Sequence, residues 1–152
     1  MWNFVLDIID RQKHAFDLKS AGDFEEAESI QRQCVVDLAR YLGHHHQLTL
    51  RAITRHCAIL FLVDKARSVE ILADLTNECS VVLGGRHADT CEAAAAWYAT
   101  LREMGQHSAA KDVARRFLEW LLKADVGSLD DEQARVRDAI LRSMPEVPKP
   151  KS

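Results

Sequence analysis

One nine-residue pattern occurs twice in this sequence and limits the folds that the chain can adopt. Residues 42–50 read LGHHHQLTL and residues 83–91 read LGGRHADTC, so leucine, glycine, histidine and threonine return at the same places 41 residues later (83 − 42 = 41). Apolar positions elsewhere keep a similar step, since Ala27, Val69 and Ala110 are 42 and 41 residues apart (69 − 27 and 110 − 69). A period that holds two helices predicts stacked helix pairs.

The spacing of apolar residues within each segment predicts helices. Leu50, Ile53, Cys57 and Leu60 follow the i, i+3, i+7, i+10 spacing of one helix face, and no segment shows the period-2 alternation of a strand. All three prolines lie at position 145 or later, so nothing before them forbids a helix. We therefore expect an all-α chain with helices near residues 2–20, 23–42, 48–63, 67–83, 89–104, 107–124 and 129–143.

These segments predict one domain over residues 1–144. Its three antiparallel helix pairs lie near residues 2–42, 48–83 and 89–124, and a capping helix near 129–143 covers the apolar face of the last pair. Capping boxes are expected at two helix starts: Asp89 with Glu92, and Ser128 with Asp131. Residues 145–152, which hold all the prolines, are predicted to be a disordered tail.

The composition argues against several classes of function. The chain has 20 basic and 23 acidic residues and a formal net charge of −3, which argues against nucleic-acid binding through a broad basic face. No apolar stretch approaches the roughly 20 residues of a membrane span, and the N-terminus lacks the features of a signal peptide, so we expect a soluble cytoplasmic protein. The sequence has no glycine-rich phosphate loop, G-x-S-x-G turn or HExxH motif, so we expect neither enzyme activity nor a cofactor.

Cysteines and histidines are the residues best suited to hold a metal ion such as zinc. The four cysteines are scattered, without a C-x-x-C pair, which favours buried reduced thiols. The run His44-His45-His46 places three adjacent side chains that cannot easily point at one ion. A site that combines His46 with His87 or Cys79 is the alternative, and we expect no metal.

Residues 21–28 read AGDFEEAE and resemble the turn between the two helices of a tetratricopeptide repeat, in which glycine makes the turn and alanine lets the helices approach closely. The repeat period and the leucine-glycine-x-x-histidine-x-x-threonine loop resemble the kinesin-light-chain subtype in particular. This resemblance covers about residues 8–125. The chain departs from the family in its second turn, residues 63–69, which has no glycine, and in its third turn, residues 104–110, which has no aromatic residue.

The resemblance implies a right-handed superhelical solenoid, whose first helices line a concave groove for extended or helical peptides of partner proteins. It implies no catalytic activity. Where the family often carries asparagine on these helices, this chain has Lys13, Arg55 and Ala96. Projected residue by residue, the groove face consists of Gln12, Phe16, Lys19, Arg51, Arg55, Ala58, Glu92, Ala96, Ala99 and Arg102.

Four of these groove positions are basic, namely Lys19, Arg51, Arg55 and Arg102. Because arginine binds carboxylates through two parallel hydrogen bonds, we expect a partner segment that is acidic or ends in a carboxylate and lies across the three arginines. The alternative is that these side chains are solvated helix faces. The predicted function is therefore a non-catalytic protein–protein interaction module, an adaptor or scaffold.

A second class of function follows from the apolar start of the chain. Trp2, Phe4 and Val5 lie on a first helix that no preceding repeat covers, and an exposed apolar face there would pair with a partner or with a second copy, unless it folds back on the chain. The alternative function is thus a self-assembling structural module, a homo-oligomer that pairs through apolar terminal helices. Trp97 and Tyr98 are interpreted as core filling rather than as a stacking site.

Overall fold

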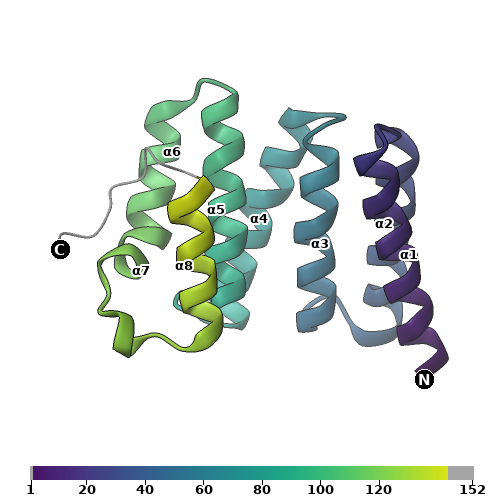
Figure 1. Cartoon of the computed structure of the whole chain (residues 1–152), viewed down its shortest axis with the longest axis horizontal. Coiled ribbons are helices and arrows are strands. Elements are labelled where there is room, and N and C mark those ends of the chain that lie inside the picture. Colours follow the sequence, from purple (N-terminus) through teal and green to yellow (C-terminus); the bar gives the residue numbers. More distant parts are fainter. Residues whose placement is uncertain (1, 144–152) are drawn as a thin grey trace. The chain divides into compact units, whose positions relative to one another are not determined.

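The computed structural model describes the backbone of residues 2–143 and the side chains of residues 3–143. The chain is all-α over this range, with 84% of the described residues in helices and no strand among them (Figure 1). The all-α prediction is confirmed. The predicted tail, residues 145–152, and the side chain of Trp2 lie outside the described residues.

The helical segments agree closely with the predicted ranges. The elements, in chain order, are α1 Trp2–Ser20, α2 Phe24–Leu42, α3 Gln47–Leu60, α4 Lys65–Val82, α5 Ala88–Glu103, α6 His107–Val113, the π-helical segment η1 Ala114–Leu118, α7 Glu119–Lys123, the 3₁₀ turn η2 Val126–Ser128 and α8 Asp131–Ser143. Because α6, η1 and α7 follow one another without a break, they correspond to the single helix predicted at 107–124. None of the helices described here combines the length and apolar character needed to cross a membrane.

The chain divides into two compact units, Met1–Ile71 and Leu72–Ser152, and the boundary falls inside α4. In the first unit, α2 packs against both α1 and α3. One core cluster is centred on Ile8, Cys34, Leu38 and Ala52, and a second is formed by Ala15, Ala27 and Ile59. Three of these residues are alanines, and their small side chains let the helix axes approach closely.

The turns that join the two helices of each pair are of two kinds, one with a glycine of positive φ and one with an aspartate cap. In the first pair Gly22 has a φ of +91°, and in the third Gly105 has a φ of +77°, a backbone region that favours glycine. In the second pair Val63 takes this place without a positive φ. There, Asp64 N donates to the Leu60 carbonyl at 2.7 Å, and Asp64 Oδ1 accepts from Arg67 N at 3.2 Å. An aspartate cap therefore replaces the missing glycine turn.

The structure corrects the predicted register of the second repeat by one residue. Ala27, Ser68 and Ala110 occupy the same place after their turns, and each is 0% exposed. The true offsets are therefore 41 and 42 (68 − 27 and 110 − 68), and Val69, which was aligned with the two alanines, is only half-buried. A small side chain is required at this position because Ser68 Oγ donates to the Cys57 carbonyl of the facing helix at 3.0 Å.

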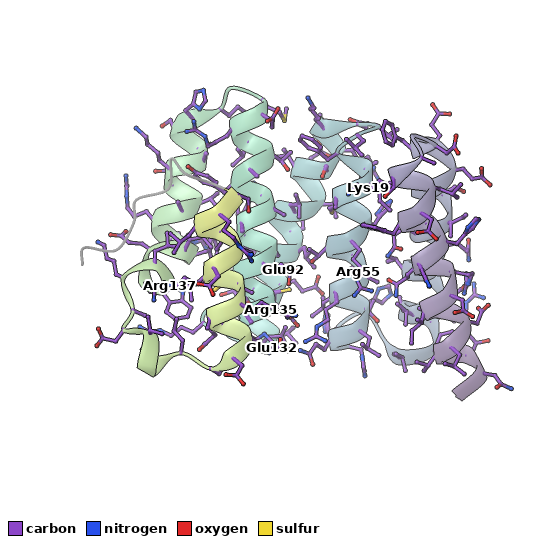
Figure 2. All side chains as sticks on the ribbon, in the orientation of Figure 1. Lys19, Arg55, Glu92, Glu132, Arg135 and Arg137 are labelled. Carbon is purple, nitrogen blue, oxygen red and sulfur yellow. The ribbon has the colours of Figure 1, made fainter. Side chains whose placement is uncertain are left out.

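In the second unit, α5 packs against α6 and η1, and α8 packs against α5 and α7. Val136 and Ile140 form the apolar face of α8, and both are buried. Arg137 (Figure 2) is also buried, and its Nη1 donates to the carbonyl of Ala124 at 2.9 Å, beyond the last residue of α7. This helix therefore contacts the preceding helix pair within the unit.

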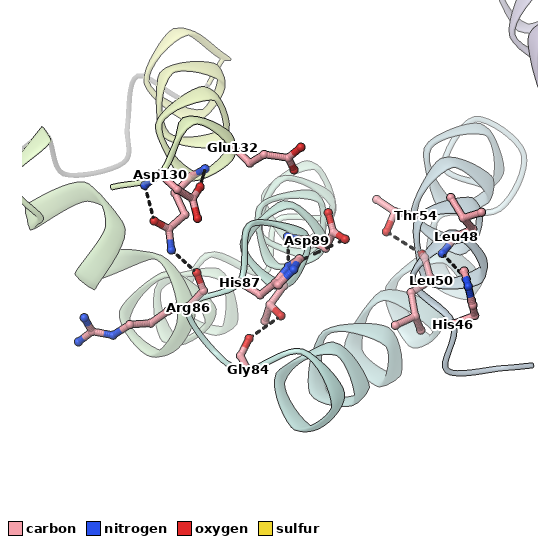
Figure 3. A network of polar contacts seen from close by, with 12 residues as sticks. His46, Leu48, Leu50, Thr54, Gly84, Arg86, His87, Asp89, Asp130 and Glu132 are labelled. Carbon is pink, nitrogen blue, oxygen red and sulfur yellow. Dashed lines mark hydrogen bonds and ion pairs between the residues drawn. The ribbon is translucent and has the colours of Figure 1, made fainter. Parts of the chain in front are cut away.

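The N-terminal cap of α8 differs from the predicted one. Asp130 Oδ1 accepts from Gln133 N at 2.7 Å, and Gln133 Oε1 accepts from Asp130 N at 2.9 Å (Figure 3). This reciprocal pair is the capping box, so the prediction of Ser128 with Asp131 is wrong. Ser128 belongs instead to the 3₁₀ turn, where its Oγ donates to the Asp125 carbonyl.

Candidate peptide-binding groove

The two histidine loops that repeat in the sequence cap the helices that follow them. His46 Nδ1 accepts from Leu48 N at 3.1 Å, and His87 Nδ1 accepts from Asp89 N at 3.0 Å (Figure 3). Both histidines are N-cap residues in extended backbone, with ψ of 140°. The predicted capping box of Asp89 with Glu92 is therefore wrong, because His87 caps this helix.

Threonine completes each loop in the same way. Thr49 Oγ1 donates to the Gly43 carbonyl at 2.8 Å, and Thr90 Oγ1 donates to the Gly84 carbonyl at the same distance. Both threonines are 0% exposed. The leucine-glycine-x-x-histidine-x-x-threonine pattern thus forms the start of a helix, and this structural role explains why the pattern occurs twice in the sequence.

The histidines and cysteines are not assembled into a metal site in the part of the chain that the structure describes. Within residues 3–143, no group of three or more histidine, cysteine or acidic side chains lies close enough to share an ion. The Nδ1 atom of His46 is already used by the helix cap. All four cysteines are buried free thiols.

The first unit has an open pocket between α1 and α3, here called the α1–α3 pocket. Its volume is about 560 Å³, inside the roughly 300–1,000 Å³ range of ligand sites. Its lining residues are Ile9, Gln12, Lys13, Phe16, Lys19, Gln31, Arg55, Ala58 and Ile59. The structure brings together here five of the six groove residues projected from the sequence onto this unit.

Positive charge dominates the lining of the pocket. Lys13, Lys19 and Arg55 are cationic, and none of the lining residues is acidic. In Figure 2, Lys19 comes from α1 and Arg55 from α3. Lys19 Nζ lies 5.8 Å from the centre of the Phe16 ring. Arg55 is exposed, and no carboxylate within residues 3–143 forms an ion pair with it.

Apolar side chains on α1 form one bank of the pocket. Phe16 is 61% exposed and Ile9 is 52% exposed, and both line it. Large apolar side chains of this exposure are stabilised when another molecule removes them from water. On the opposite bank, Ala58 is exposed on α3 and leaves room for a backbone to approach.

Amide groups form part of the pocket lining. Gln31 on α2 is 1% exposed, and its Nε2 donates both to the Ala52 carbonyl at 3.1 Å and to Gln12 Oε1 at 2.9 Å. Gln31 therefore links α1, α2 and α3. It was not predicted as a site residue, although it lies on the buried stripe of α2 with Ala27 and Cys34.

The other projected groove residues lie elsewhere. Arg51 on α3 is half-buried, does not line the α1–α3 pocket and already has another partner residue. Glu92, Ala96, Ala99 and Arg102 all lie on α5 of the second unit. Glu92 is exposed and Arg102, which also has a partner, is half-buried. The pocket residues that the projection missed are Ile9, Lys13, Gln31 and Ile59.

The apolar start of the chain is partly folded back. The Phe4 ring lies 4.4 Å from that of Tyr41, centre to centre, and Phe4 packs against the core cluster of Ile8. Val5 is half-buried as well. The exposed apolar residues of α1 are instead Leu6, Ile9 and Phe16. Of the two alternatives considered for this segment, folding back on the chain is the one observed for Phe4.

The aromatic residues of the third pair fill the core, as interpreted from the sequence. Tyr98 is 3% exposed, and the ring of Trp97 lies 6.2 Å from that of Phe117.

Comparison of the chain with protein-family models, with curated proteins and with solved structures gives no match.

Proposed function

We propose that this chain is a non-catalytic protein-interaction module, which binds an acidic peptide segment of another protein in the α1–α3 pocket. The observation that carries the proposal is the charge of the lining, in which three of nine side chains are cationic and none is acidic. The chain as a whole has a net charge of −3, so this is a local concentration of positive charge on an acidic protein. Complementary charge steers encounter and selects among partners.

The apolar bank adds a second requirement on the partner. An aliphatic or aromatic side chain placed against Phe16 and Ile9 would remove exposed apolar surface from water, which contributes roughly 25 cal/mol per Å². Aromatic anchors of this kind carry much of the affinity in small interfaces. The proposed partner segment therefore combines acidic residues with at least one large apolar side chain.

The repeated local structure supports a tetratricopeptide-like architecture for the module. The equivalent positions Ala27, Ser68 and Ala110 and the two histidine loops support a helix-pair unit that recurs along the chain. A right-handed superhelical solenoid of such pairs is part of the proposal. In that architecture the first helix of each pair lines the binding face, and α1 and α3 are the first helices of their pairs.

A random-peptide library displayed on phage, selected on the immobilised whole chain, tests this function. The expected result is enrichment of acidic peptides with a large apolar residue, whose affinity falls as salt rises. The double variant Lys19→Glu with Arg55→Glu should weaken the enriched peptides about tenfold or more. Enrichment without charge bias, or affinity unchanged in the variant, would show that the pocket is not the site.

The matched control is Arg40→Glu with Lys111→Glu, which makes the same change in net charge at exposed positions outside the pocket. It should leave peptide affinity within about twofold of the wild type, because exposed charges distant from a site are screened by salt. An equal loss in both double variants would mean that the effect comes from net charge alone, and would overturn the proposal.

Self-association is the second candidate function, and the exposed stripe of α1 favours it. Leu6, Ile9 and Phe16 are each more than half exposed along one side of this helix. Light scattering over a range of protein concentrations would detect a dimer. Leu6→Glu, which lies outside the pocket lining, should abolish such a dimer without affecting peptide binding. A dimer that Lys19→Glu with Arg55→Glu abolishes would instead make a second copy the occupant of the pocket.

A further inference from the structure

The orientation of two amide groups in the α1–α3 pocket is fixed by one backbone carbonyl. The Ala52 carbonyl can only accept a hydrogen bond, so the atom of Gln31 that faces it at 3.1 Å must be the donor, Nε2. Gln31 is 1% exposed, and turning its amide over would leave two acceptors without the donor Nε2 that both now share.

The orientation of Gln31 in turn fixes that of Gln12. The second N–H of Gln31 Nε2 points at Gln12, so the Gln12 atom at 2.9 Å must be the acceptor, Oε1. The Nε2 group of Gln12 therefore lies on the opposite side of its carboxamide. No acceptor within residues 3–143 bonds to it.

The remaining donor of Gln12 has a specific use. Gln12 is half-buried and lines the pocket, so a molecule that enters the pocket can contact this residue. A neutral acceptor is cheaper to desolvate there than a carboxylate, and the three cations of the lining already supply the recognition of charge. A helix would use most of its carbonyls internally, whereas an extended segment offers a carbonyl at every residue.

We propose that the acidic partner segment lies extended across the α1–α3 pocket and that one of its main-chain carbonyls accepts a hydrogen bond from Gln12 Nε2. This inference rests on the proposed function and adds the backbone conformation of the partner and a positioning role for Gln31. Gln31 itself contacts Gln12 and Ala52, and it acts by presenting the Gln12 amide in one orientation.

Ester substitution of the partner backbone tests the hydrogen bond. The probe is the acidic peptide most enriched by the library selection, labelled with fluorescein and made with each amide in turn replaced by an ester, which weakens one carbonyl acceptor. Affinity for the whole chain is measured by fluorescence anisotropy with wild type and with Gln12→Met. Gln12→Met should weaken the unmodified peptide about three- to tenfold, the effect of one neutral hydrogen bond.

The coupling between the two changes is the decisive result. At one position of the peptide, the ester should weaken binding to the wild type but should have little further effect on binding to Gln12→Met. A general loss of stability in the variant could not produce this pattern. Gln33→Met, on the outer face of α2 and outside the pocket lining, is the matched control and should retain the full ester effect. A peptide that depends on Lys19 and Arg55 but shows no coupling with Gln12 at any position would overturn this inference and leave the proposed function standing. Failure of any acidic peptide to bind would overturn both.

Discussion

Arg11 Nη2 donates a hydrogen bond to Asp37 Oδ2 at 2.8 Å, and this partly buried ion pair joins α1 to α2. The same guanidinium reaches Asp7 one turn earlier, with its Nε 3.0 Å from Asp7 Oδ2. Burial acts to raise the pKa of Asp37, but the hydrogen bonds from Arg11 and Gln33 outweigh it and hold that pKa below its ordinary value. The ion pair therefore stabilises the hairpin that carries one bank of the α1–α3 pocket.

Asp37→Asn should lower the free energy of unfolding by about 1 kcal/mol, more than an exposed ion pair contributes, because this one is partly buried and hydrogen-bonded. A depressed carboxyl pKa contributes stability above the pKa of the unfolded chain, near 3.9, and loses it as the pH falls through the folded value. Urea denaturation should therefore show the variant approaching the wild type below about pH 4. Asp112→Asn, in an exposed pair 3.6 Å from Arg115, is the control and should have almost no effect.

Alanine at the loop glycines should destabilise the fold without any steric clash. Gly43 and Gly84 have φ values of +96° and +100°, and a Cβ added at either would meet nothing within 4 Å. The cost is therefore conformational, about 1–3 kcal/mol for each, and thermal melting should show it for both. Gly127→Ala, where the space is also open and φ is not positive, should melt within a degree or two of the wild type. An equal loss at Gly127 would refute the backbone explanation.

The sequence predicted the helices well because glycine, proline and apolar spacing mark them locally. The register slip in the second repeat arose where this signal is weakest. Val63 stands at the place of Gly22, and the aspartate cap at Asp64 makes the turn without a positive φ. An alignment that matches Asp23 with Asp64 gives the observed offset of 41 (64 − 23).

The pocket was only partly predictable, for a reason visible in Gln31. A polar residue inside an apolar stripe can be either a surface residue or a buried hydrogen-bonding group, and only the facing Ala52 carbonyl and Gln12 decide between them. The π-helical turn at 114–118 also has no local sequence signal, because it interrupts a helix whose composition is unbroken.

The buried cysteines should be unreactive in the folded chain. Burial raises the pKa of Cys57, Cys79 and Cys91 to about 12, and it raises that of Cys34 as well. Because the thiolate is the nucleophile, a disulfide reagent at about pH 8 should modify none of the four in the native state within minutes. All four should react in denaturing urea. Ser29→Cys, exposed on α2, should react at once and confirms that the reagent is active.

The last prediction concerns the buried histidine His56, which is 8% exposed and whose Nε2 lies 3.4 Å from Glu28 Oε1. Burial lowers the pKa of His56 by more than the hydrogen bond and charge of Glu28 raise it. The unfolded chain therefore binds a proton at this site more readily than the folded chain does. Its contribution to stability is present above the unfolded pKa, near 6.5, and is lost as the pH falls through the lower folded value.

His56→Gln removes the titrating group while keeping a side chain that can hydrogen-bond to Glu28. The free energy of unfolding of the wild type should fall more steeply than that of the variant between about pH 7 and pH 5, as measured by urea denaturation at each pH. His14→Gln, at an exposed position on α1, is the matched control and should retain the wild-type slope. If His56→Gln retains that slope too, burial does not outweigh Glu28 and His56 makes no net contribution to the pH dependence. A variant that loses stability more steeply than the wild type would mean that Glu28 governs the protonation of His56, so that the buried pair stabilises the first unit in acid.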